Sequence, residues 1–410
     1  MQTTSSDPVS STQAAQADRT AIRRPRRLPP SVAFLLIATL VVAFLAASSA
    51  PSPLYALYRE SWHFSAFTLT VVFGSYAFAL LVSLLLFGGL SDHLGRRTVV
   101  LAAVALEIGA MAMFRGADSV GWLIAARVLQ GVATGMATSV LSATLLDLHP
   151  ARGALFNGLA PMVGMALGAL DAGALVQFAP RPLHLVYELL LAIFIVQAML
   201  ALRLPETAAR RPGAWRSLLP SAYVPPAARP LLVRVLPLNT AGWALGGFYL
   251  SLGPTLARLV TGRDTPLIGG ALIATLVLTG AVAIYAVRQR AARPVLRTSA
   301  LLLGAGLAIT LAGVHFRAAL PFFGGTLVAG LGFGAGFNAA VRTIVPAAQP
   351  NERAGLMSTF FVLSYLAFSV PSLLAGLAVG AVGLHATALG YGALLIALCA
   401  TAWVATRERR

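Results

Sequence analysis

The sequence predicts an all-α membrane protein whose twelve transmembrane helices form two pseudo-symmetric six-helix bundles. Three observations support this fold class: the composition, the number of long apolar segments, and an internal repeat. Of the 410 residues, 58% are apolar and only 10% are charged, and the mean hydropathy is +0.81. Soluble domains carry about 25% charged residues. Lipid must therefore surround much of this chain.

Twelve apolar segments are long enough to cross a membrane. A transmembrane helix needs roughly twenty residues to span about 30 Å of hydrocarbon. The segments are continuous and lack alternation with period two, which favours helices over barrel strands. They are residues 31–50, 65–90, 98–115, 119–146, 153–178, 181–203, 231–256, 266–287, 299–316, 319–345, 354–380 and 384–406.

The thirty basic residues are all arginine and predict the orientation. If the N-terminus is cytoplasmic, 23 arginines lie in the tails and cytoplasmic loops, six lie in outside loops, and one lies within a helix, which accounts for the thirty. Cytoplasmic loops are enriched in basic residues. We therefore expect a multi-pass protein of a bacterial inner membrane with both termini in the cytoplasm. The net charge of +17 follows from these loops and indicates no nucleic-acid partner.

Two polar regions divide the chain into domains. Residues 1–30 predict a disordered cytoplasmic tail, although the small residues 46–50 also resemble the cleavage site of a signal peptide. Residues 204–230 contain six prolines and four arginines, which is typical of a semi-rigid linker. The linker separates a first bundle, residues 31–203, from a second bundle and short tail, residues 231–410.

The two predicted bundles look related by an offset of 201 residues. At this offset Gly131 and Gly135 match Gly332 and Gly336. Three further pairs have the same offset: Pro53 and Pro254, Arg96 and Arg297, and Arg152 and Arg353. Parallel six-helix halves are typical of carriers that rock around a site at the membrane midplane.

The segment between the second and third predicted helices carries the most specific motif. It reads Gly-Gly-Leu-Ser-Asp-His-Leu-Gly-Arg-Arg over residues 88–97. Glycines allow a sharp turn and close approach, a carboxylate is favoured at a helix N-terminus, and arginine pairs well with a carboxylate of another helix. Candidate residues are Gly88, Leu90, Asp92, Gly95, Arg96 and Arg97, with Asp147 as the expected carboxylate partner.

This motif closely resembles that of the major facilitator superfamily, Gly-x-Leu-Ala-Asp-Arg-x-Gly-Arg-Lys/Arg. The chain differs at Ser91 and His93. The resemblance implies a latch that closes the cytoplasmic side in the outward-facing state. Asp92 would then contact the eleventh helix near Ala354, and Arg96 would pair with Asp147. The alternative is a basic loop that sets orientation only.

The fourth predicted helix contains Arg127, which must face protein or water because charge is costly in lipid. With Gln130 and Gly131 it resembles the family's Arg-x-x-Gln-Gly signature, which implies proton coupling as in antiporters. The alternative is a structural arginine that bonds carbonyls of the first helix. Gly131 and Gly135 also form a face of small residues that favours close helix packing.

Three acids within predicted helices are candidates to carry a proton. Glu107 lies roughly 14 Å from the inner end of its helix, and Asp171 and Glu188 lie roughly 10 Å from the outer ends of theirs. Arg127 lies at a similar depth, so a buried carboxylate there can exchange a proton under its influence. For each acid the alternative is a structural ion pair or a water-facing position.

The fifth predicted helix bears on the direction of transport. Gly164, Gly168 and Gly173 keep the spacing of the exporters' Gly-x-x-x-Gly-Pro-x-x-Gly-Gly pattern. Ala169 replaces the proline, however, and Ala172 replaces a glycine, so the resemblance to exporters is partial. Small residues at these positions still favour packing against another helix.

In the family, the first, fourth, seventh and tenth helices line the substrate path. Candidates there are Tyr55, Asn239, Trp243, Tyr249, Phe333 and Asn338. Their apolar and aromatic character favours a lipophilic or weakly polar small molecule.

We therefore expect a secondary active transporter, closest by resemblance to the drug:proton antiporters, that exports its substrate by alternating access. Alternatives are a sugar or metabolite carrier, including a proton symporter, and a non-transporting membrane sensor. No catalytic, nucleotide-binding or metal-binding pattern occurs in the sequence. The expected partners are the substrate, protons and lipid, with no cofactor and a monomeric state.

Overall fold

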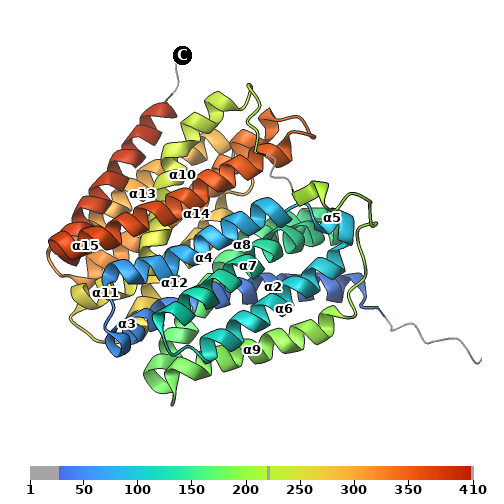
Figure 1. The fold of residues 1–410 in the computed structure, drawn as a ribbon. Helices are drawn as coiled ribbons and strands as arrows, with labels where there is room; N and C mark the ends of the chain where they lie inside the picture. The colour runs from blue at the N-terminus through green and yellow to red at the C-terminus, as the bar shows by residue number, and fades with distance from the viewer. Residues whose placement is uncertain (1–26, 219–221, 408–410) are drawn as a thin grey trace, which may run out of the picture.

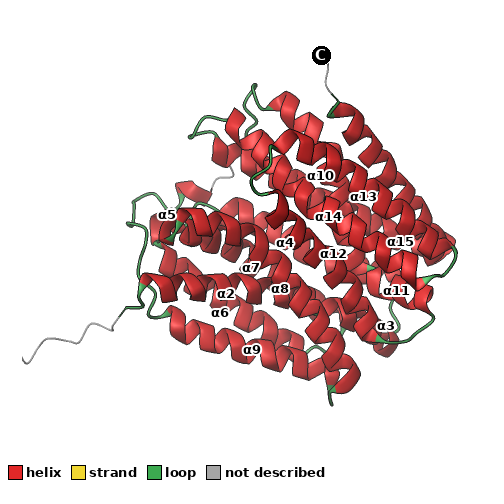
Figure 2. Ribbon diagram, turned by 180° about the vertical axis from the view of Figure 1, so that it is seen from behind, coloured by secondary structure: helices red, strands yellow, loops and turns green. Residues whose placement is uncertain are grey.

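The computed structural model describes residues 27–218 and 222–407, and across these residues it contains helices and loops without a strand (Figure 2). The predicted N-terminal tail lies almost wholly outside the described residues. The predicted all-α membrane fold is confirmed. The first eight helices are α2 (Pro30–Ser49), α3 (Pro51–Trp62), α4 (Ala66–Phe87), α5 (Ser91–Leu94), α6 (Arg96–Arg115), α7 (Val120–Leu148), α8 (Pro150–Phe178) and α9 (Pro182–Ala201).

The second half of the chain repeats this arrangement after the 3₁₀ turn η2 (Arg216–Leu218). Its helices are α10 (Arg229–Ser251), α11 (Gly253–Thr261), α12 (Pro266–Val287), α13 (Ala292–His315), α14 (Ala319–Ile344) and α15 (Arg353–Ala405), with the 3₁₀ turn η3 (Val345–Ala347) before α15.

Ten helices of the described chain are long and apolar enough to cross a membrane. They account for eleven of the twelve predicted segments, because α15 contains both 354–380 and 384–406. The break expected between those two segments is present at Gly383, whose φ of 80° and ψ of 163° are not helical and divide α15 into two helical parts. The remaining segment, 231–256, forms α10 and the start of α11. At about 1.5 Å per residue, the 23 residues of α10 also reach across the hydrocarbon.

The first and seventh predicted segments are each followed by a short second helix. Pro51 begins α3 directly after α2, and Pro254 lies at the start of α11 directly after α10. Proline is well tolerated in the first turn of a helix, where its missing N–H group has no partner to lose. The prolines therefore bend the chain, and a short second helix begins after each of α2 and α10.

Helices α2–α9 pack together as one bundle, and α10–α15 pack as another (Figure 1). Between the bundles, α8 packs along α12 and α4 packs along α15. Short α3 and α11 also touch, and they lie together at the end of the molecule opposite α5 (Figures 1 and 2). We call the end that carries α5 and most arginines the arginine-rich face, and the end with α3 and α11 the opposite face.

Glycine packing reveals the register of the repeat in α7 and α14. A Cβ on Gly131 would meet the carbonyl of Tyr76, and one on Gly135 would meet the carbonyl of Leu80, both on α4. The equivalent contacts of α14 with α12 are not made by Gly332 and Gly336, which the sequence offset predicted, but by two other glycines. They are Gly330 against Leu276 and Gly334 against Gly280.

The offset of 201 is therefore wrong in this helix, where the structural offset is 199 residues (330 minus 131, and 334 minus 135). Gly332 faces Leu303 and Ser299 of α13 instead. Glycine is so frequent in α14 that sequence identity alone could not distinguish the two registers.

The glycines of α8 also pack closely against backbone. Gly164 and Gly168 lie against Val42 and Ala46 of α2, whereas Gly173 lies against Leu267 of α12 in the other bundle. Such contacts bring helix axes close without side chains between them.

A matched pair of substitutions on α14 tests the importance of these contacts. In Gly334→Ala the new methyl group would meet the backbone oxygen of Gly280, and Gly324→Ala has no neighbour within 4 Å. We expect Gly334→Ala to destabilise the protein by about 1–3 kcal/mol. Gly324→Ala should leave stability unchanged or raise it slightly, because alanine favours helix. Thermal unfolding in detergent measures both, and equal midpoints would contradict the packing argument.

Candidate functional site

Arg127 lies at the centre of the first bundle, in α7, and its side chain is fully buried. Its Nη1 donates hydrogen bonds to the carbonyl of Ser48 at 3.1 Å and to Oε1 of Gln130 at 2.5 Å. A charged group in lipid is tolerated only with such partners. The hydrogen bond from Arg127 to the carbonyl of Ser48 on α2 is the contact expected if the arginine has a structural role.

Gln130 connects this arginine to an acid. Its Nε2 donates to the carbonyl of Ala47 at 3.0 Å and to Oε1 of Glu107, on α6, at 3.2 Å. Gln130 and Glu107 are both fully buried, and the second carboxylate oxygen of Glu107 has no partner. Among the described residues, Arg127 and Glu107 form no direct ion pair. One amide therefore bridges the cation and the acid.

Aromatic rings cover the remaining sides of the arginine. The guanidinium carbon lies 4.7 Å from the ring centre of Tyr76 and 5.7 Å from that of Tyr55. The hydroxyl of Ser48 donates to the hydroxyl of Tyr76 at 2.7 Å. Cation–π attraction stabilises a buried guanidinium. We call Ser48, Tyr76, Glu107, Arg127 and Gln130 the buried polar cluster.

The other two candidate acids lie outside the buried polar cluster. Asp171 is exposed on α8, with no polar partner among the described residues. Glu188, on α9, pairs with Arg115 at 2.9 Å, and its side chain is 25% exposed. Of the three acids, the structure brings only Glu107 to the arginine.

The second bundle has a neutral pair at the corresponding place. With the structural offset of 199, Arg127 corresponds to Thr326 on α14. The hydroxyls of Thr326 and Tyr249 lie 2.8 Å apart, and both residues are buried. The two bundles therefore share packing but differ in buried charge.

The predicted substrate-path residues are spread over both bundles. Asn239, Trp243 and Phe333 line one small cavity. Tyr55 lies beside Arg127, Tyr249 pairs with Thr326, and the buried side-chain oxygen of Asn338 has no hydrogen-bond partner. Asn239 donates from Nδ2 to the hydroxyl of Ser364 at 2.8 Å.

An aromatic cluster, not identified from the sequence, surrounds Trp243. Its ring centre lies 4.9 Å from that of Tyr365 and 5.8 Å from those of Phe337 and Phe368. Phe73 of the first bundle lies 5.0 Å from Phe368. These rings come from three helices of the second bundle and one of the first. No motif marks them in the sequence, because aromatic residues are frequent in every apolar helix.

Helix α4 connects the aromatic cluster with the buried polar cluster. Phe73 contacts Phe368, and Tyr76, about one turn further along α4, covers Arg127. The two clusters therefore meet neighbouring turns of the same helix.

Gly95 brings the motif loop into contact with the linker. It has φ 91°, and a Cβ there would meet the carboxylate of Glu206. That carboxylate accepts a hydrogen bond at 2.6 Å from the backbone N–H of Arg96, the first residue of α6. A carboxylate is favoured at a helix N-terminus. Gly95 is thus required both by its backbone angle and by its close neighbour.

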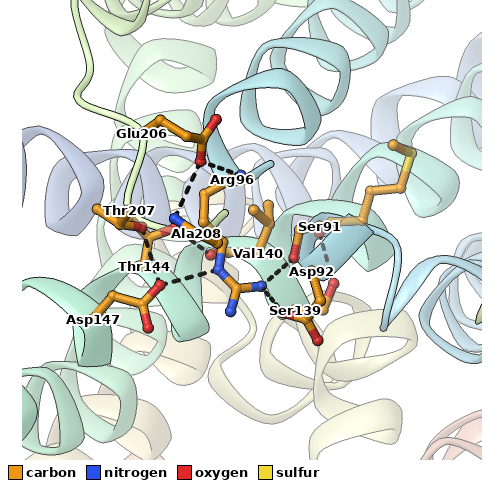
Figure 3. Close-up of polar contacts among 11 residues, drawn as sticks. Ser91, Asp92, Arg96, Ser139, Val140, Thr144, Asp147, Glu206, Thr207 and Ala208 are labelled. Carbon is orange, nitrogen blue, oxygen red and sulfur yellow. Dashed lines mark hydrogen bonds and ion pairs between the residues drawn. The ribbon is translucent and has the colours of Figure 1, made fainter. Parts of the chain in front are cut away.

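Arg96 links three carboxylate-bearing segments (Figure 3). Its side chain bonds Asp147 of α7 at 3.1 Å and Asp92 of α5 at 2.6 Å. The structure thus brings Arg96 and Asp147 together, whereas the carboxylate of Asp92 is paired within its own loop. Arg97 bonds the carbonyl of Leu202 and, within the described part of the chain, no carboxylate.

Glu206 and Thr207 of the linker are members of this site that sequence reasoning missed. Thr207 donates to Asp147 at 3.0 Å, and the backbone N–H of Arg211 donates to the carbonyl of His93 at 3.2 Å. At its other end the linker bonds α15, because the N–H of Tyr223 donates to the carbonyl of Gly355. The linker therefore joins the motif loop to the second bundle.

On the opposite face, an ion pair connects the two bundles. Arg258 of α11 bonds Glu60 of α3 at 3.1 Å and Asp264 of its own bundle at 2.6 Å. These residues border a cavity of about 310 Å³ between the bundles. Pro53 of α3 and Pro254 of α11 also line this cavity.

Two related bundles of membrane-spanning helices, with a buried charge in the first and an ion pair between them on the opposite face, are the architecture of a membrane carrier. The chain belongs to the Major Facilitator Superfamily, whose profile matches residues 35–290. It is similar over short segments to fungal transporters. The MFS-type transporter pydD of an Acremonium species is 32% identical over 113 residues. The MFS efflux transporter aclA of Aspergillus oryzae is 36% identical over 109 residues.

Each of these matches covers 26% of this chain and 20% of the relative. Solved structures match over nearly the whole chain. A mutant of the nucleoside transporter NupG has a TM-score of 0.70 at 11% identity, covering 93% of this chain and 100% of that one. The human organic anion transporter MFSD10 has a TM-score of 0.62 at 18% identity, covering 92% and 100%. At these identities the likeness concerns the fold alone.

The contact between Glu206 and Arg96 can be tested by proteolysis. In Glu206→Gln the charge-assisted bond to the N-terminus of α6 is weakened, so the adjacent linker should open more often. A loss of about 1 kcal/mol corresponds to roughly fivefold faster cleavage by trypsin after Arg210. Glu188→Gln, which lies on the opposite face, should leave the cleavage rate unchanged. If both variants are cleaved at the same rate, Glu206 does not hold the linker.

Proposed function

We propose that this protein is a proton-coupled exporter of a small lipophilic or weakly polar molecule. The observation that carries the proposal is the buried connection from Glu107 through Gln130 to Arg127. We place the protein in a bacterial inner membrane with the arginine-rich face in the cytoplasm, because basic loops remain inside. Substrate molecules would then leave the cell in exchange for protons that enter it across this membrane.

Coupling follows from the charges of the buried polar cluster. An ionised Glu107 is attracted to Arg127 through the amide of Gln130, whereas a protonated Glu107 leaves the arginine without a counter-charge. Because uncompensated charge is costly in a dry interior, the two protonation states favour different positions of α2, α6 and α7. Proton binding and release would thereby drive the change between inward-facing and outward-facing conformations.

The aromatic cluster supports a lipophilic cargo. Trp243, Tyr365 and Phe368 offer ring faces at the boundary between the bundles. Planar apolar molecules bind such rings through large contact areas. Phe73 and Tyr76 of α4 contact the rings and the arginine respectively, so that cargo and proton would compete for the position of this helix. Amides such as Asn239 and Asn338 add a few polar contacts.

Export is supported by two observations. The glycines of α8 pack against α2 directly before Ala47 and Ser48, whose carbonyls bind Gln130 and Arg127. The relative aclA is also described as an efflux transporter. A sugar or metabolite carrier would need more hydrogen-bonding groups among the path residues, and a sensor would need no proton-exchanging acid beside the arginine.

The conformation described here corresponds, in this proposal, to the inward-facing state. The pair of Glu60 and Arg258 closes the opposite face, and the carboxylate of Asp92 remains free of the second bundle. In the outward-facing state Asp92 would instead meet α15 near Ala354. The linker, which contacts both places, would guide this closure.

Removing the acid tests proton coupling. Glu107→Gln keeps the size and hydrogen bonds of the side chain but cannot exchange a proton. The substrate is first identified from a panel of lipophilic cations, sugars and amino acids in proteoliposomes. For that substrate we expect the variant to lose at least tenfold of the efflux driven by a pH gradient. Exchange of substrate for substrate, which needs no proton, should be retained. Glu188→Gln should keep full gradient-driven efflux.

Two results would contradict this assignment. Full gradient-driven efflux by Glu107→Gln would exclude Glu107 as the proton carrier, and full coupled transport by Arg127→Ala would exclude the arginine. If collapse of the gradient leaves transport by the unmodified protein unchanged, coupling itself is wrong.

The ion pair of the opposite face tests alternating access. In Glu60→Gln the ion pair between the bundles is lost, whereas Asp264→Asn removes an ion pair within the second bundle and leaves that between the bundles intact. A cysteine placed at buried Ala56, which lines the cavity, should react several-fold faster with an impermeant maleimide in Glu60→Gln than in Asp264→Asn. The native Cys399 is buried and gives little background. Equal rates in both variants would show that the pair does not close this face.

A further inference from the structure

The arginine-rich face of the second bundle is almost without acids. The sequence has no Asp or Glu between Asp264 and Glu352, and none between Glu352 and Glu408. Glu408 lies outside the described residues. Exposed arginines of this face include Arg288, Arg290, Arg293, Arg297 and Arg407. This part of the surface therefore has a strong positive charge.

Two of these arginines gather on one ring. The guanidinium carbon of Arg297, on α13, lies 5.3 Å from the ring centre of Trp403, and that of Arg407, directly after α15, lies 3.8 Å from it. Attraction to the ring holds a guanidinium in place without neutralising it. The ring thus positions two positive charges of different helices next to each other.

Other arginines of this face have separate partners. Arg288 lies 3.8 Å from the ring of Tyr285 and donates to its carbonyl. Arg342 donates to the carbonyls of Val287 and Arg290. Arg297 and Arg407 are exposed, and each guanidinium lies over the indole ring of Trp403.

The site lies at the depth of lipid headgroups. Arg297 is five residues inside α13, roughly 7 Å from its first turn, and Trp403 lies two residues before the end of α15. Tryptophan is enriched at the boundary between hydrocarbon and water. Arginine at such a depth extends its head toward the headgroups while its stem stays in the apolar layer.

We infer that Arg297, Trp403 and Arg407 form a binding site for the headgroup of an anionic phospholipid. The guanidinium forks match the geometry of phosphate oxygens, and the indole covers the adjacent glycerol and acyl region. The lipid would supply the negative charge that this part of the described chain lacks. The inference does not depend on which substrate the protein transports or on proton coupling.

The alternative is that these arginines only set the orientation of the chain, as basic loops do. That role needs positive charge but neither the indole nor the forked geometry. Lysine variants separate the two roles, because lysine preserves charge and orientation but loses the planar fork.

The experiment uses the purified full chain in a neutral detergent. Phosphatidylglycerol and phosphatidylcholine are titrated separately, and lipid-bound species are counted by native mass spectrometry. We expect phosphatidylglycerol to bind with at least fivefold preference. The double variant Arg297→Gln/Arg407→Gln should lose this preference, and Arg297→Lys/Arg407→Lys and Trp403→Leu should each reduce it by a factor of two or more. The matched control Arg263→Gln/Arg317→Gln, which removes two exposed arginines of the opposite face, should keep it.

Four results would overturn the inference. They are equal binding of the two lipids by the unmodified protein, unchanged preference in the glutamine double variant, full preference in the lysine double variant, and equal loss in the control. Glycerol 3-phosphate that displaces the lipid at micromolar concentration would show that the site takes free phosphate rather than a membrane lipid. Thermal unfolding without added lipid verifies that each variant is folded before titration.

Discussion

The rest of the first bundle depends on the burial of one charge, that of Arg127. A guanidinium without water needs hydrogen bonds or a counter-charge, and the bundle supplies Gln130, the carbonyl of Ser48 and two tyrosine rings. These partners have to come close, which explains the glycines around them. Gly131 and Gly135 bring α7 against α4, and Gly168 brings α8 against α2.

The second bundle reproduces this packing without the charge. Gly330 and Gly334 bring α14 against α12, yet the place of the arginine is taken by Thr326, paired with Tyr249. A neutral pair of hydroxyls has no cost of charge burial and makes no demand for a counter-ion. The two bundles therefore share their helix packing but not their buried charges. In the proposed mechanism the first bundle carries the proton-exchanging charges, and the second provides most of the aromatic surface.

Much of this could be predicted from the sequence, because hydropathy and arginine placement report directly on lipid contact. The helices, the family and the pairing partners Arg96 and Asp147 were all visible in local patterns. The role of Gln130 as a bridge and the contribution of Glu206 were not, since they depend on helices that meet only in the folded chain. The aromatic cluster around Trp243 was missed for the same reason. The repeat register was wrong because the glycines of α14 occur at several equivalent spacings.

Arg258 touches an acid of each bundle, and this has a consequence for the speed of opening. When the bundles separate at the opposite face, the guanidinium leaves Glu60 but keeps Asp264. The cation therefore never passes through a state without a carboxylate neighbour, and the released Glu60, already largely in contact with water, is readily hydrated. Because Asp264 stays bound to Arg258, the pair with Glu60 can stabilise the closed gate at equilibrium while adding little to the activation barrier for opening. A carrier must cycle as well as close, and this arrangement of three side chains permits both.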